Sequence, residues 1–578
     1  MFITNQSLHS GTWQAFERVI CRLIACEGFV GIRLVGRTGD KGADIIAHKN
    51  GKRWLFQAKH WKNKIGVDVI DQTLAAMQLY RAQVPAIVSL SGFDDLAREH
   101  QMALLSRGIP LQLITADDMV RRSERLPKEC DSPVNLKDYQ EEAVKTLVKA
   151  FKDSYDRRAL VVMATGLGKT VTAAETLRRI NNLSPVKVLV LAHTNELVYQ
   201  LERAFWGFLR PDQATLIWNG YEQPTDVELK SAQYVFGCLN TVSSFVASGG
   251  HLDGFNVVLI DECHHVGGSM YNNILDNTAA GKQGGPFLIG LTATPWRPDE
   301  KDLQGIFGPP LVCVDMVTGL KRGFLSNVDY RMYTDNINWE ALASIHGDRL
   351  SPRYINRTLF ITQWDDSVVV ELQKAWKEQK RPRAIVFCGT IDHAITMRDR
   401  INALGFCNAA AIYSQTASGF NLSVYERSKI LCDFHDGAVN VICAVDIFNE
   451  GVDVPDVNII VFQRVTHSRR IFIQQLGRGL RLAADKDKVI VLDFVSDIRR
   501  FAAGISLKDS LASVGDEASR RSVRISLPHK ITFMRVGAED PKTEGFLREW
   551  LDDVSAIEDA GEDTSVLQFP PKLAGGRE

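Results

Sequence analysis

Residues 162–170, Val-Met-Ala-Thr-Gly-Leu-Gly-Lys-Thr, decide how the middle of this chain folds. An apolar run precedes the two glycines and a helix-forming run follows them, so the glycines lie in a loop between a strand and a helix. Because Gly166 and Gly168 carry no side chains, the backbone N–H groups of this loop can surround a phosphate chain. Lys169 then supplies a positive charge to the β- and γ-phosphates, and the Thr170 hydroxyl completes the shell of a bound Mg²⁺. The stretch predicts a nucleotide-binding loop.

One position departs from the strict phosphate-loop pattern, because Met163 stands where the pattern has a glycine. The alternative interpretation is a Gly-rich turn that binds nothing. The flanking strand and helix favour the nucleotide loop. The loop residues expected to bind ATP and its Mg²⁺ are Thr165, Gly166, Gly168, Lys169 and Thr170.

Two neighbouring acids follow a second apolar run. Residues 257–260 are Val-Val-Leu-Ile, and Asp261 and Glu262 come directly after them. Both carboxylates are therefore expected at the carboxyl end of a buried strand, where α/β proteins bind ligands. There Asp261 can reach the Mg²⁺ shell, and Glu262 can polarise the attacking water. A surface turn is the alternative, but a turn rarely follows so apolar a strand.

Two arginines, Arg478 and Arg481, lie near the end of the sequence Ile-Gln-Gln-Leu-Gly-Arg-Gly-Leu-Arg at 473–481. On a helix they would share one face, from which both could approach a γ-phosphate across a cleft, as an arginine finger does. Taken alone, the pair is equally typical of a solvated basic helix face.

In this order the motifs resemble those of superfamily 2 helicases and translocases, over roughly residues 132–500. The resemblance implies an adenine contact at Gln140, an acidic box at 261–264, a coupling motif at 292–294, the first strand of a second lobe at 384–388, a segment linking ATP to nucleic acid at 445–453, with Asp453 at the nucleotide, and an arginine motif at 474–481. A basic residue often stands in that family near the place of Asn195, so this position departs from its pattern.

Residues 1–125 follow a different pattern. Residues 12–24 read as an amphipathic helix, and a later acid, Asp44, opens an apolar run that ends at the turn pair Asn50 and Gly51. Alternation along the return strand sends Gln57 and Lys59 to the same face. Pairing through the turn brings Asp44 near Gln57, within about one residue of register.

An acid, an amide oxygen and a lysine at one sheet edge suit phosphodiester hydrolysis. Asp44 and Gln57 offer the oxygen ligands that Mg²⁺ prefers, and Lys59 can orient or deprotonate the hydrolytic water and stabilise the developing charge. A partly exposed hairpin with unrelated polar residues is the alternative.

The segment 8–122 resembles the Mrr-like branch of the PD-(D/E)xK restriction endonucleases, in which a glutamine can replace the second acid. The residues that carry the resemblance include the turn at 39–42 and Gln-Ala-Lys-His-Trp at 57–61. It implies that Glu17, on the first long helix, is the extra acid that these nucleases often carry. The first half of the segment is also basic, which suits a phosphate backbone or simply a solvated surface. Its basic residues are Arg18, Arg22, Arg33, Arg37, Lys41, Lys52, Arg53, Lys59, Lys62 and Lys64.

Composition sets broad limits. The 578 residues are too many for one core, and the formal net charge of −1 gives no overall field that would attract a polyanion. The cysteines form no C-x-x-C pair, which favours reduced thiols. No signal peptide or membrane-spanning run is recognisable, so we expect a cytoplasmic protein without a membrane partner.

These features predict an α/β protein with a restriction-endonuclease-like α/β/α domain followed by two RecA-like parallel-sheet domains. The expected divisions are an endonuclease domain at 1–125, a linker at 126–134, an ATP-binding lobe at 135–325, a connection at 326–378, a second helicase lobe at 379–500 and a C-terminal extension at 501–578.

The two resemblances imply an ATP-dependent DNA helicase or translocase coupled to a Mg²⁺-dependent DNA endonuclease, in prokaryotic restriction or antiviral defence. Its cofactors would be ATP and Mg²⁺, and its partner nucleic acid, foremost double-stranded DNA; further defence-system subunits or a homo-oligomer are compatible with this function. Two alternatives stay open. The N-terminal domain could be an inactive DNA-binding module in repair or remodelling, since Gln57 replaces an acid. The motor could also act on RNA, because its motifs do not distinguish RNA from DNA.

Overall fold

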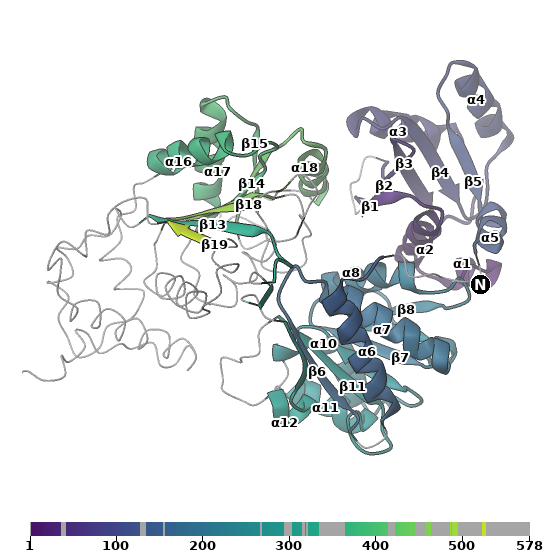
Figure 1. Ribbon diagram of the computed structural model, residues 1–578. Helices are drawn as coiled ribbons and strands as arrows, with labels where there is room; N and C mark the ends of the chain where they lie inside the picture. Colours follow the sequence, from purple (N-terminus) through teal and green to yellow (C-terminus); the bar gives the residue numbers. More distant parts are fainter. Residues whose placement is uncertain are drawn as a thin grey trace, which may run out of the picture.

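Three sheets, each with its own helices, make up the computed structural model (Figure 1). They confirm the expected α/β class, with one N-terminal sheet domain and two parallel-sheet domains. The structure describes residues 2–35, 42–127, 134–153, 156–265, 269–293, 303–314, 318–319, 322–333, 365–413, 424–445, 457–463, 488–494 and 523–526, and the single positions 422, 482 and 486.

The N-terminal domain has a five-stranded sheet in the order β1-β2-β3-β4-β5. Strands β1 to β3 are antiparallel, and β3, β4 and β5 are parallel. Its elements are α1 (Asn5–Ser10), α2 (Trp13–Cys26), β1 (Val30–Leu34), β2 (Ile45–Lys49), β3 (Lys52–Lys59), α3 (Val67–Leu79), β4 (Val84–Ser89), α4 (Asp95–Ser106), β5 (Gln112–Thr115) and α5 (Ala116–Glu124).

Local chemistry explains the two elements that the sequence predicted here. The hydroxyl of Thr12 accepts a hydrogen bond from the backbone N–H of Ala15 and caps α2, whose apolar face is buried. The β2–β3 turn has Asn50 at φ 52° and Gly51 at φ 71°, so both residues are left-handed, as a two-residue type I′ hairpin requires.

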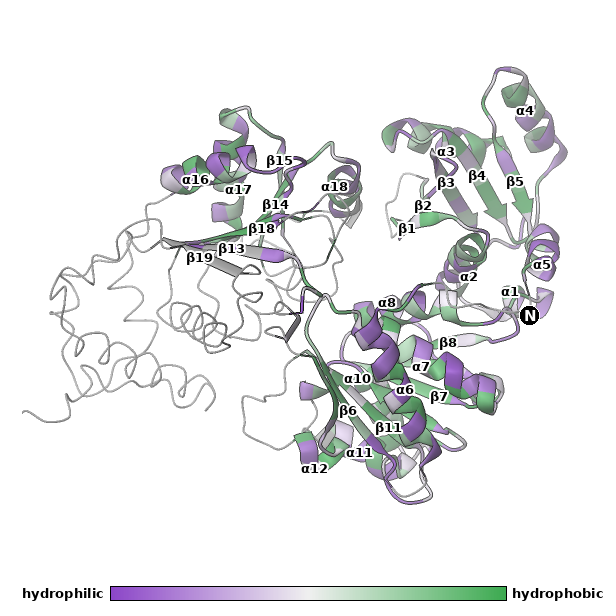
Figure 2. Cartoon of the chain, viewed as in Figure 1, coloured by the Kyte–Doolittle hydropathy of each residue, from purple (hydrophilic) through white to green (hydrophobic). Residues whose placement is uncertain are grey.

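The second sheet, which we call lobe 1, has seven parallel strands in the order β12-β6-β11-β10-β7-β9-β8. Its strands are mostly hydrophobic (Figure 2). Their buried residues alternate between two core clusters, one on each face, as a parallel sheet between helices needs. Its strands are β6 (Arg158–Met163), β7 (Val188–Ala192), β8 (Thr215–Trp218), β9 (Tyr234–Cys238), β10 (Val257–Ile260), β11 (Phe287–Thr292) and β12 (Pro310–Val314). Its helices are α6 (Asp138–Lys152), α7 (Lys169–Leu183), α8 (Asn195–Phe205), α9 (Asp226–Ser231), α10 (Leu239–Ala247), α11 (Ser269–Thr278) and α12 (Leu303–Phe307), with short 3₁₀ turns η1 (Trp206–Phe208) and η2 (Cys263–His265).

The third sheet, lobe 2, also has seven parallel strands, in the order β15-β16-β14-β17-β18-β13-β19. Its elements are β13 (Asn327–Tyr333), α16 (Asp365–Lys377), β14 (Ala384–Phe387), α17 (Ile391–Ala403), β15 (Ala409–Ile412), α18 (Val424–Asp436), β16 (Val441–Ala444), β17 (Ile459–Phe462), β18 (Lys488–Phe494) and β19 (Val523–Ser526). Strand β13 lies within the expected inter-lobe connection, yet it pairs with β18 in this sheet. In the described part of the chain, no helix is long and apolar enough to cross a membrane.

A buried ion cluster joins the N-terminal domain to lobe 1. Arg18 of α2 donates to Glu202 of α8 at 2.8 Å and to Glu222 at 2.5 Å, and the three side chains are 9%, 2% and 7% exposed. Thr215 and Tyr199 add hydrogen bonds to these two carboxylates, at 2.5 Å and 3.1 Å. Burial by itself would lower the pKa of Arg18, but the charges of Glu202 and Glu222 outweigh it and raise this pKa above its ordinary value.

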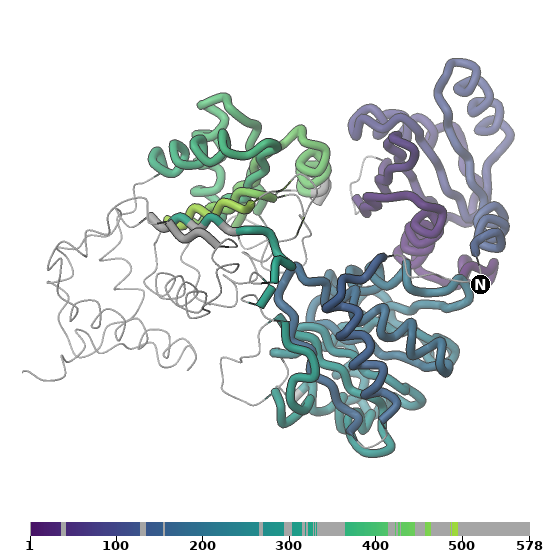
Figure 3. Tube along the Cα trace, viewed as in Figure 1, coloured from purple at the N-terminus to yellow at the C-terminus, as the bar shows by residue number. Residues whose placement is uncertain are grey.

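Apolar and backbone contacts surround the cluster. Trp206 of η1 belongs to the hydrophobic core of the N-terminal domain. The backbone N–H of Phe2 donates to the carbonyl of Pro211 at 2.6 Å, and Arg22 donates to the carbonyl of Arg210 at 3.1 Å. The tube view shows the first helices lying against lobe 1 (Figure 3). Arg18 and Arg22, which the sequence suggested for phosphate contacts, therefore bind lobe 1 instead.

Replacing Arg18 by Met should strongly destabilise the junction, because it leaves two buried carboxylates without their cation. We expect the free energy of unfolding in urea to fall by about 3–5 kcal/mol. The exposed pair Arg121–Asp118 offers a control, since Arg121→Met should cost less than about 1 kcal/mol. Equal losses in the two variants would contradict a structural role of the buried cluster.

Candidate functional site

The predicted nucleotide loop connects β6 to α7 and needs its glycines. Gly166 and Gly168 have φ angles of 94° and 83°, which only glycine adopts readily. A Cβ at Gly168 would lie 2.5 Å from the side-chain nitrogen of Gln140. Since Gly168 is the N-cap of α7, the free N–H groups and positive dipole end of that helix begin at the loop.

Gln140 of α6 is built into the support of this loop. Its side-chain N–H donates to the carbonyl of Leu167 at 2.9 Å, and the hydroxyl of Tyr139 donates to the same carbonyl at 3.0 Å. The oxygen of Gln140 accepts from the backbone N–H of Lys137 at 3.0 Å. The structure thus places the expected adenine contact directly against the phosphate loop.

The two acids of the acidic box lie at the carboxyl end of β10, as predicted. Since the sheet order is β6-β11-β10, this strand is separated from the nucleotide loop by β11 alone. Lys169 donates to Glu262 at 2.8 Å, so the lysine of the predicted nucleotide loop and the acid form an ion pair. Burial lowers the pKa of Lys169, and the charges of Glu262 and Asp261 more than reverse this effect, so that this pKa is raised. Glu262 has φ 47°, a strained angle for a residue other than glycine.

Asp261 has the surroundings of a cation ligand. Burial raises the pKa of its carboxyl to about 6, with a further contribution from the charge of Glu262. One of its oxygens, Oδ1, is buried and has no hydrogen-bond partner among the described residues. A divalent cation would satisfy that oxygen and lower the pKa of the carboxyl again. Asp261 therefore fits Mg²⁺, which takes oxygen ligands, and the Thr170 hydroxyl stays a predicted second ligand.

His264 connects the acidic box to the next strand, a role that the sequence did not reveal. Its Nδ1 lies 3.1 Å from the hydroxyl of Thr292, at the end of β11, and 3.3 Å from Glu262. Thr292 is the first residue of the expected coupling motif. The other expected residues of the motor, Thr294, Asp453, Gln474, Arg478 and Arg481, lie outside the described residues.

The predicted nuclease residues meet at the end of the β2–β3 hairpin. The register pairs Ile45 with Phe56, so that Asp44 faces Gln57, as expected. The carboxylate of Asp44 accepts a hydrogen bond from the backbone N–H of Ala58 at 2.6 Å. Both Asp44 and Gln57 are buried. The hairpin therefore holds one carboxylate and one carboxamide side by side.

Thr73 of α3 decides which way the Gln57 carboxamide points. A hydroxyl has one hydrogen, and Thr73 donates its hydrogen to the carbonyl of Val69 at 2.7 Å. It therefore accepts from the amide nitrogen of Gln57, whose second N–H reaches the Val69 carbonyl at 3.2 Å. In this orientation the Gln57 oxygen accepts from the ammonium of Lys59 at 3.0 Å. No sequence pattern around Gln57 indicated Thr73, because it lies on a different element.

Lys59 stands beside an exposed aromatic side chain. Its ammonium lies 5.0 Å from the ring centre of Trp61, and that side chain is 47% exposed. Lys62 and Lys64 next to it are exposed too. A hydrogen bond anchors the loop to the rest of the domain, since the hydroxyl of Ser91 donates to the carbonyl of Trp61 at 2.8 Å. This surface offers an aromatic ring and positive charge next to Lys59.

Glu17, the proposed extra acid, is a buried residue of α2. Its neighbour Phe16 packs against His60 with ring centres 5.3 Å apart, so α2 crosses close to the end of β3. In the described residues, no group of three or more His, Cys, Asp and Glu side chains forms a metal site. The candidate nuclease site would instead hold a cation through Asp44 and the oxygen of Gln57, which fits the preference of Mg²⁺ for oxygen ligands and retained waters.

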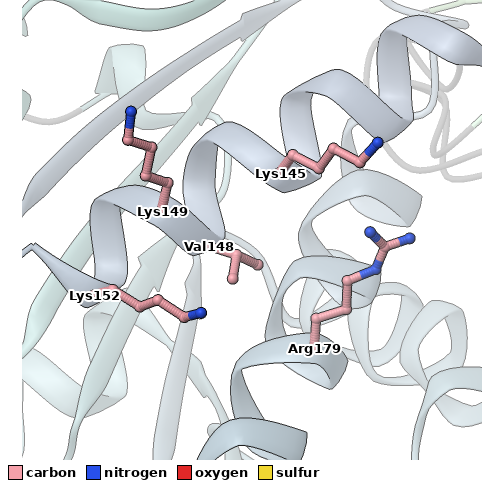
Figure 4. Close-up of a pocket in the computed structure, with 5 residues that line it drawn as sticks. All are labelled: Lys145, Val148, Lys149, Lys152 and Arg179. Atoms are coloured by element: carbon pink, nitrogen blue, oxygen red, sulfur yellow. The ribbon is translucent and has the colours of Figure 1, made fainter.

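A separate basic recess of about 230 Å³ lies between α6 and α7 (Figure 4). It is lined by Lys145, Val148, Lys149, Lys152 and Arg179. Arg179 is already paired with Glu141 at 2.6 Å and Glu175 at 2.7 Å. We therefore assign no ligand to this recess.

Three family models match the chain in the order of its three sheets. A restriction endonuclease model (Mrr_cat) matches residues 8–122, the model of the type III restriction enzyme res subunit matches 133–297, and the helicase conserved C-terminal domain matches 366–483. These ranges agree with the resemblances that the motifs predicted.

Known proteins resemble the motor part of the chain. "Putative mitochondrial ATP-dependent helicase irc3" of Schizosaccharomyces pombe is 27% identical over 64% of this chain and 58% of its own length. The DNA 3'-5' translocase XPB2 of Sulfurisphaera tokodaii is 25% identical over 62% of this chain and 81% of its own. The type I restriction enzyme EcoKI endonuclease subunit of Escherichia coli is 26% identical over 62% of this chain and 34% of its own. This chain therefore aligns with little more than half of the fission-yeast protein.

Taken together, the family models and relatives show that the chain combines the two domains of a superfamily 2 helicase with an Mrr-type restriction endonuclease domain.

Proposed function

We propose that the chain is an ATP-dependent DNA helicase or translocase coupled to a Mg²⁺-dependent DNA endonuclease in prokaryotic restriction or antiviral defence. The observation that carries this proposal is the meeting of Asp44, Gln57 and Lys59 at one hairpin end, in the same chain as a phosphate loop and an acidic box. The similarity to a DNA translocase and to a restriction endonuclease subunit supports DNA as the substrate.

In the motor, the ion pair between Lys169 and Glu262 would be exchanged when ATP binds. The phosphates would take the ammonium of Lys169, and Glu262 would become free to polarise the attacking water. Asp261 and Thr170 would hold Mg²⁺, which neutralises phosphate charge when bound. Arg478 and Arg481 are proposed to stabilise the transition state from lobe 2.

Two substitutions test this assignment. Lys169→Ala removes the phosphate contact and Glu262→Gln the polarising carboxylate, so both should abolish DNA-stimulated ATP hydrolysis, measured as phosphate release. Lys145→Ala, which changes an exposed lysine of α6, is the matched control and should hydrolyse ATP normally. Near-normal turnover in Glu262→Gln would refute the assignment.

In the N-terminal domain, Asp44 and Gln57 are proposed to hold Mg²⁺ against the scissile phosphate. Lys59 would orient or deprotonate the attacking water and stabilise the charge that develops on the phosphate. Glu17 is proposed as a supporting acid from α2. Trp61, Lys62 and Lys64 favour a nucleic acid as the substrate, because a ring and two ammonium groups suit a nucleic-acid strand.

Asp44→Ala and Lys59→Ala should fail in different ways. Asp44→Ala removes the one formal negative charge of the hairpin site, so the affinity for Mg²⁺ should collapse together with cleavage. Lys59→Ala should bind metal and DNA but not cut, because Lys59 acts in the chemical step. Plasmid cleavage and metal titration distinguish these results, and the DNA-free ATPase rate of both variants should match that of the wild type. Cleavage that survives in both variants would exclude this site.

A subtler change tests how Gln57 is positioned. Thr73→Val keeps the volume but removes the hydroxyl that accepts from the Gln57 amide, so the carboxamide oxygen loses its fixed direction. We expect cleavage to fall about 10–100-fold and to require more Mg²⁺, as for other residues that orient a metal ligand. Thr73→Ser should restore both values. If Thr73→Val cut at the wild-type rate and Mg²⁺ concentration, Thr73 would have no positioning role.

The glutamine at position 57 also supports a second candidate function. A site with one carboxylate binds metal more weakly than a site with two, so the N-terminal domain could bind DNA without cutting it. Absence of cleavage by the wild type on methylated, unmodified, linear and supercoiled DNA would favour that function.

A further inference from the structure

The N-terminal domain contacts lobe 2 as well as lobe 1. Arg33 of β1 donates to the carbonyl of Leu431 at 2.7 Å, and Arg53 of β3 forms an ion pair with Asp436. Both partners belong to α18. Cys432 of the same helix is buried in a small apolar cluster of the N-terminal domain, with Val35, Ala43, Ile46, Leu55, Ala76 and Tyr80. We call this set of interactions the α18 contact. It uses two more arginines that the sequence suggested for phosphate binding.

Both sides of the α18 contact are firmly held. Arg53 also donates to the carbonyl of Tyr80 at 2.6 Å, and its backbone N–H donates to the side chain of Gln83 at 2.6 Å. On the other side, Arg383 precedes β14 and donates to the carbonyls of Phe434 and, at 3.1 Å, His435. The end of α18 is thereby tied to the start of β14, an inner strand of lobe 2. A movement of lobe 2 must carry α18 with it.

The two attachments of the N-terminal domain differ in strength. The junction with lobe 1 buries a guanidinium with two carboxylates and places Trp206 in a shared core. The ion pair of the α18 contact is more accessible, with Arg53 13% and Asp436 22% exposed. A partly exposed ion pair contributes little to the free energy of folding, whereas breaking a buried ion cluster costs much of it. If the lobes move relative to one another, the α18 contact should therefore break before the junction with lobe 1 does.

We infer that the α18 contact restrains movement of lobe 2 relative to lobe 1 and so sets the ATP requirement of the motor. The N-terminal domain is fixed to lobe 1 and also attached to lobe 2, so any movement of lobe 2 relative to lobe 1 when ATP binds must break or shift the α18 contact. ATP therefore binds against this restraint. Its apparent affinity is the intrinsic affinity multiplied by the fraction of molecules in which the lobes are free to move. This inference rests on ATP hydrolysis in the proposed function but not on the nuclease chemistry.

Charge reversal gives a sharp test. Arg53→Asp and Asp436→Arg each break the ion pair, and the double variant rebuilds it with the charges exchanged. Without DNA, each single variant should lower the apparent KM for ATP, up to about fivefold, the shift that one partly exposed ion pair can produce. The kcat at saturating ATP should stay unchanged, and the double variant should return KM to the wild-type value. Lys52→Asp, an exposed neighbour on β3, is the matched control and should leave KM unaltered.

A locked contact should have the opposite effect. Cysteines placed at His48 and His435, whose rings lie 6.1 Å apart, can be joined by a short bis-maleimide linker. The linked protein should lose ATP hydrolysis, and the same reagent on the wild type should not have this effect.

Three outcomes separate the possible errors. Unchanged KM in both single variants, or a double variant that does not recover, would overturn the inference while leaving the ATPase assignment intact. Full hydrolysis by the linked protein would overturn it as well. Absence of ATP hydrolysis by the wild type, with and without DNA, would instead defeat the proposed function. Thermal unfolding of each variant, expected at the wild-type temperature, guards against a folding defect.

Discussion

A guanidinium buried between two domains needs its carboxylates, and this requirement fixes the N-terminal domain on lobe 1. Arg18 of α2 carries the positive charge, and it forms ion pairs with the carboxylates of Glu202, on α8, and Glu222. The same helix α2 carries Glu17 and packs beside the end of β3, where the candidate nuclease residues lie. Helix α8, in turn, begins just after the carboxyl end of β7 in lobe 1. The candidate nuclease site is therefore joined to lobe 1 through two packed helices.

Parallel strands impose the second constraint. Because neighbouring parallel strands end at the same edge, the loop after β6 and the acids after β10 must meet, and the pair Lys169–Glu262 is the result. The pair keeps two opposite charges satisfied in a partly buried place. In the proposed function it would also make ATP binding an exchange of partners, since the phosphates would compete with Glu262 for Lys169.

Features that depend on neighbours in the sequence could be predicted, and features that depend on distant partners could not. The glycine loop, the acids at a strand end and the hairpin with its Asn50-Gly51 turn follow from local patterns, and the structure has all three. Thr73 was missed because its partner Gln57 lies on another element. The basic residues Arg18, Arg22, Arg33 and Arg53 suit either a phosphate backbone or a solvated surface when the sequence alone is considered. They contact lobe 1 and lobe 2 instead, and their partners lie up to 398 residues away in the chain. An arginine pattern shows charge but not where that charge will be buried.

Cleavage of supercoiled plasmid by the full chain, with Mg²⁺ and with or without ATP, tests most directly whether one chain couples the two sites. The wild type should cut only when ATP is present, whereas Lys169→Ala should not cut under either condition. Lys59→Ala should hydrolyse ATP without cutting. Cleavage that is equal with and without ATP, and equal in the wild type and Lys169→Ala, would contradict the coupling of motor and nuclease.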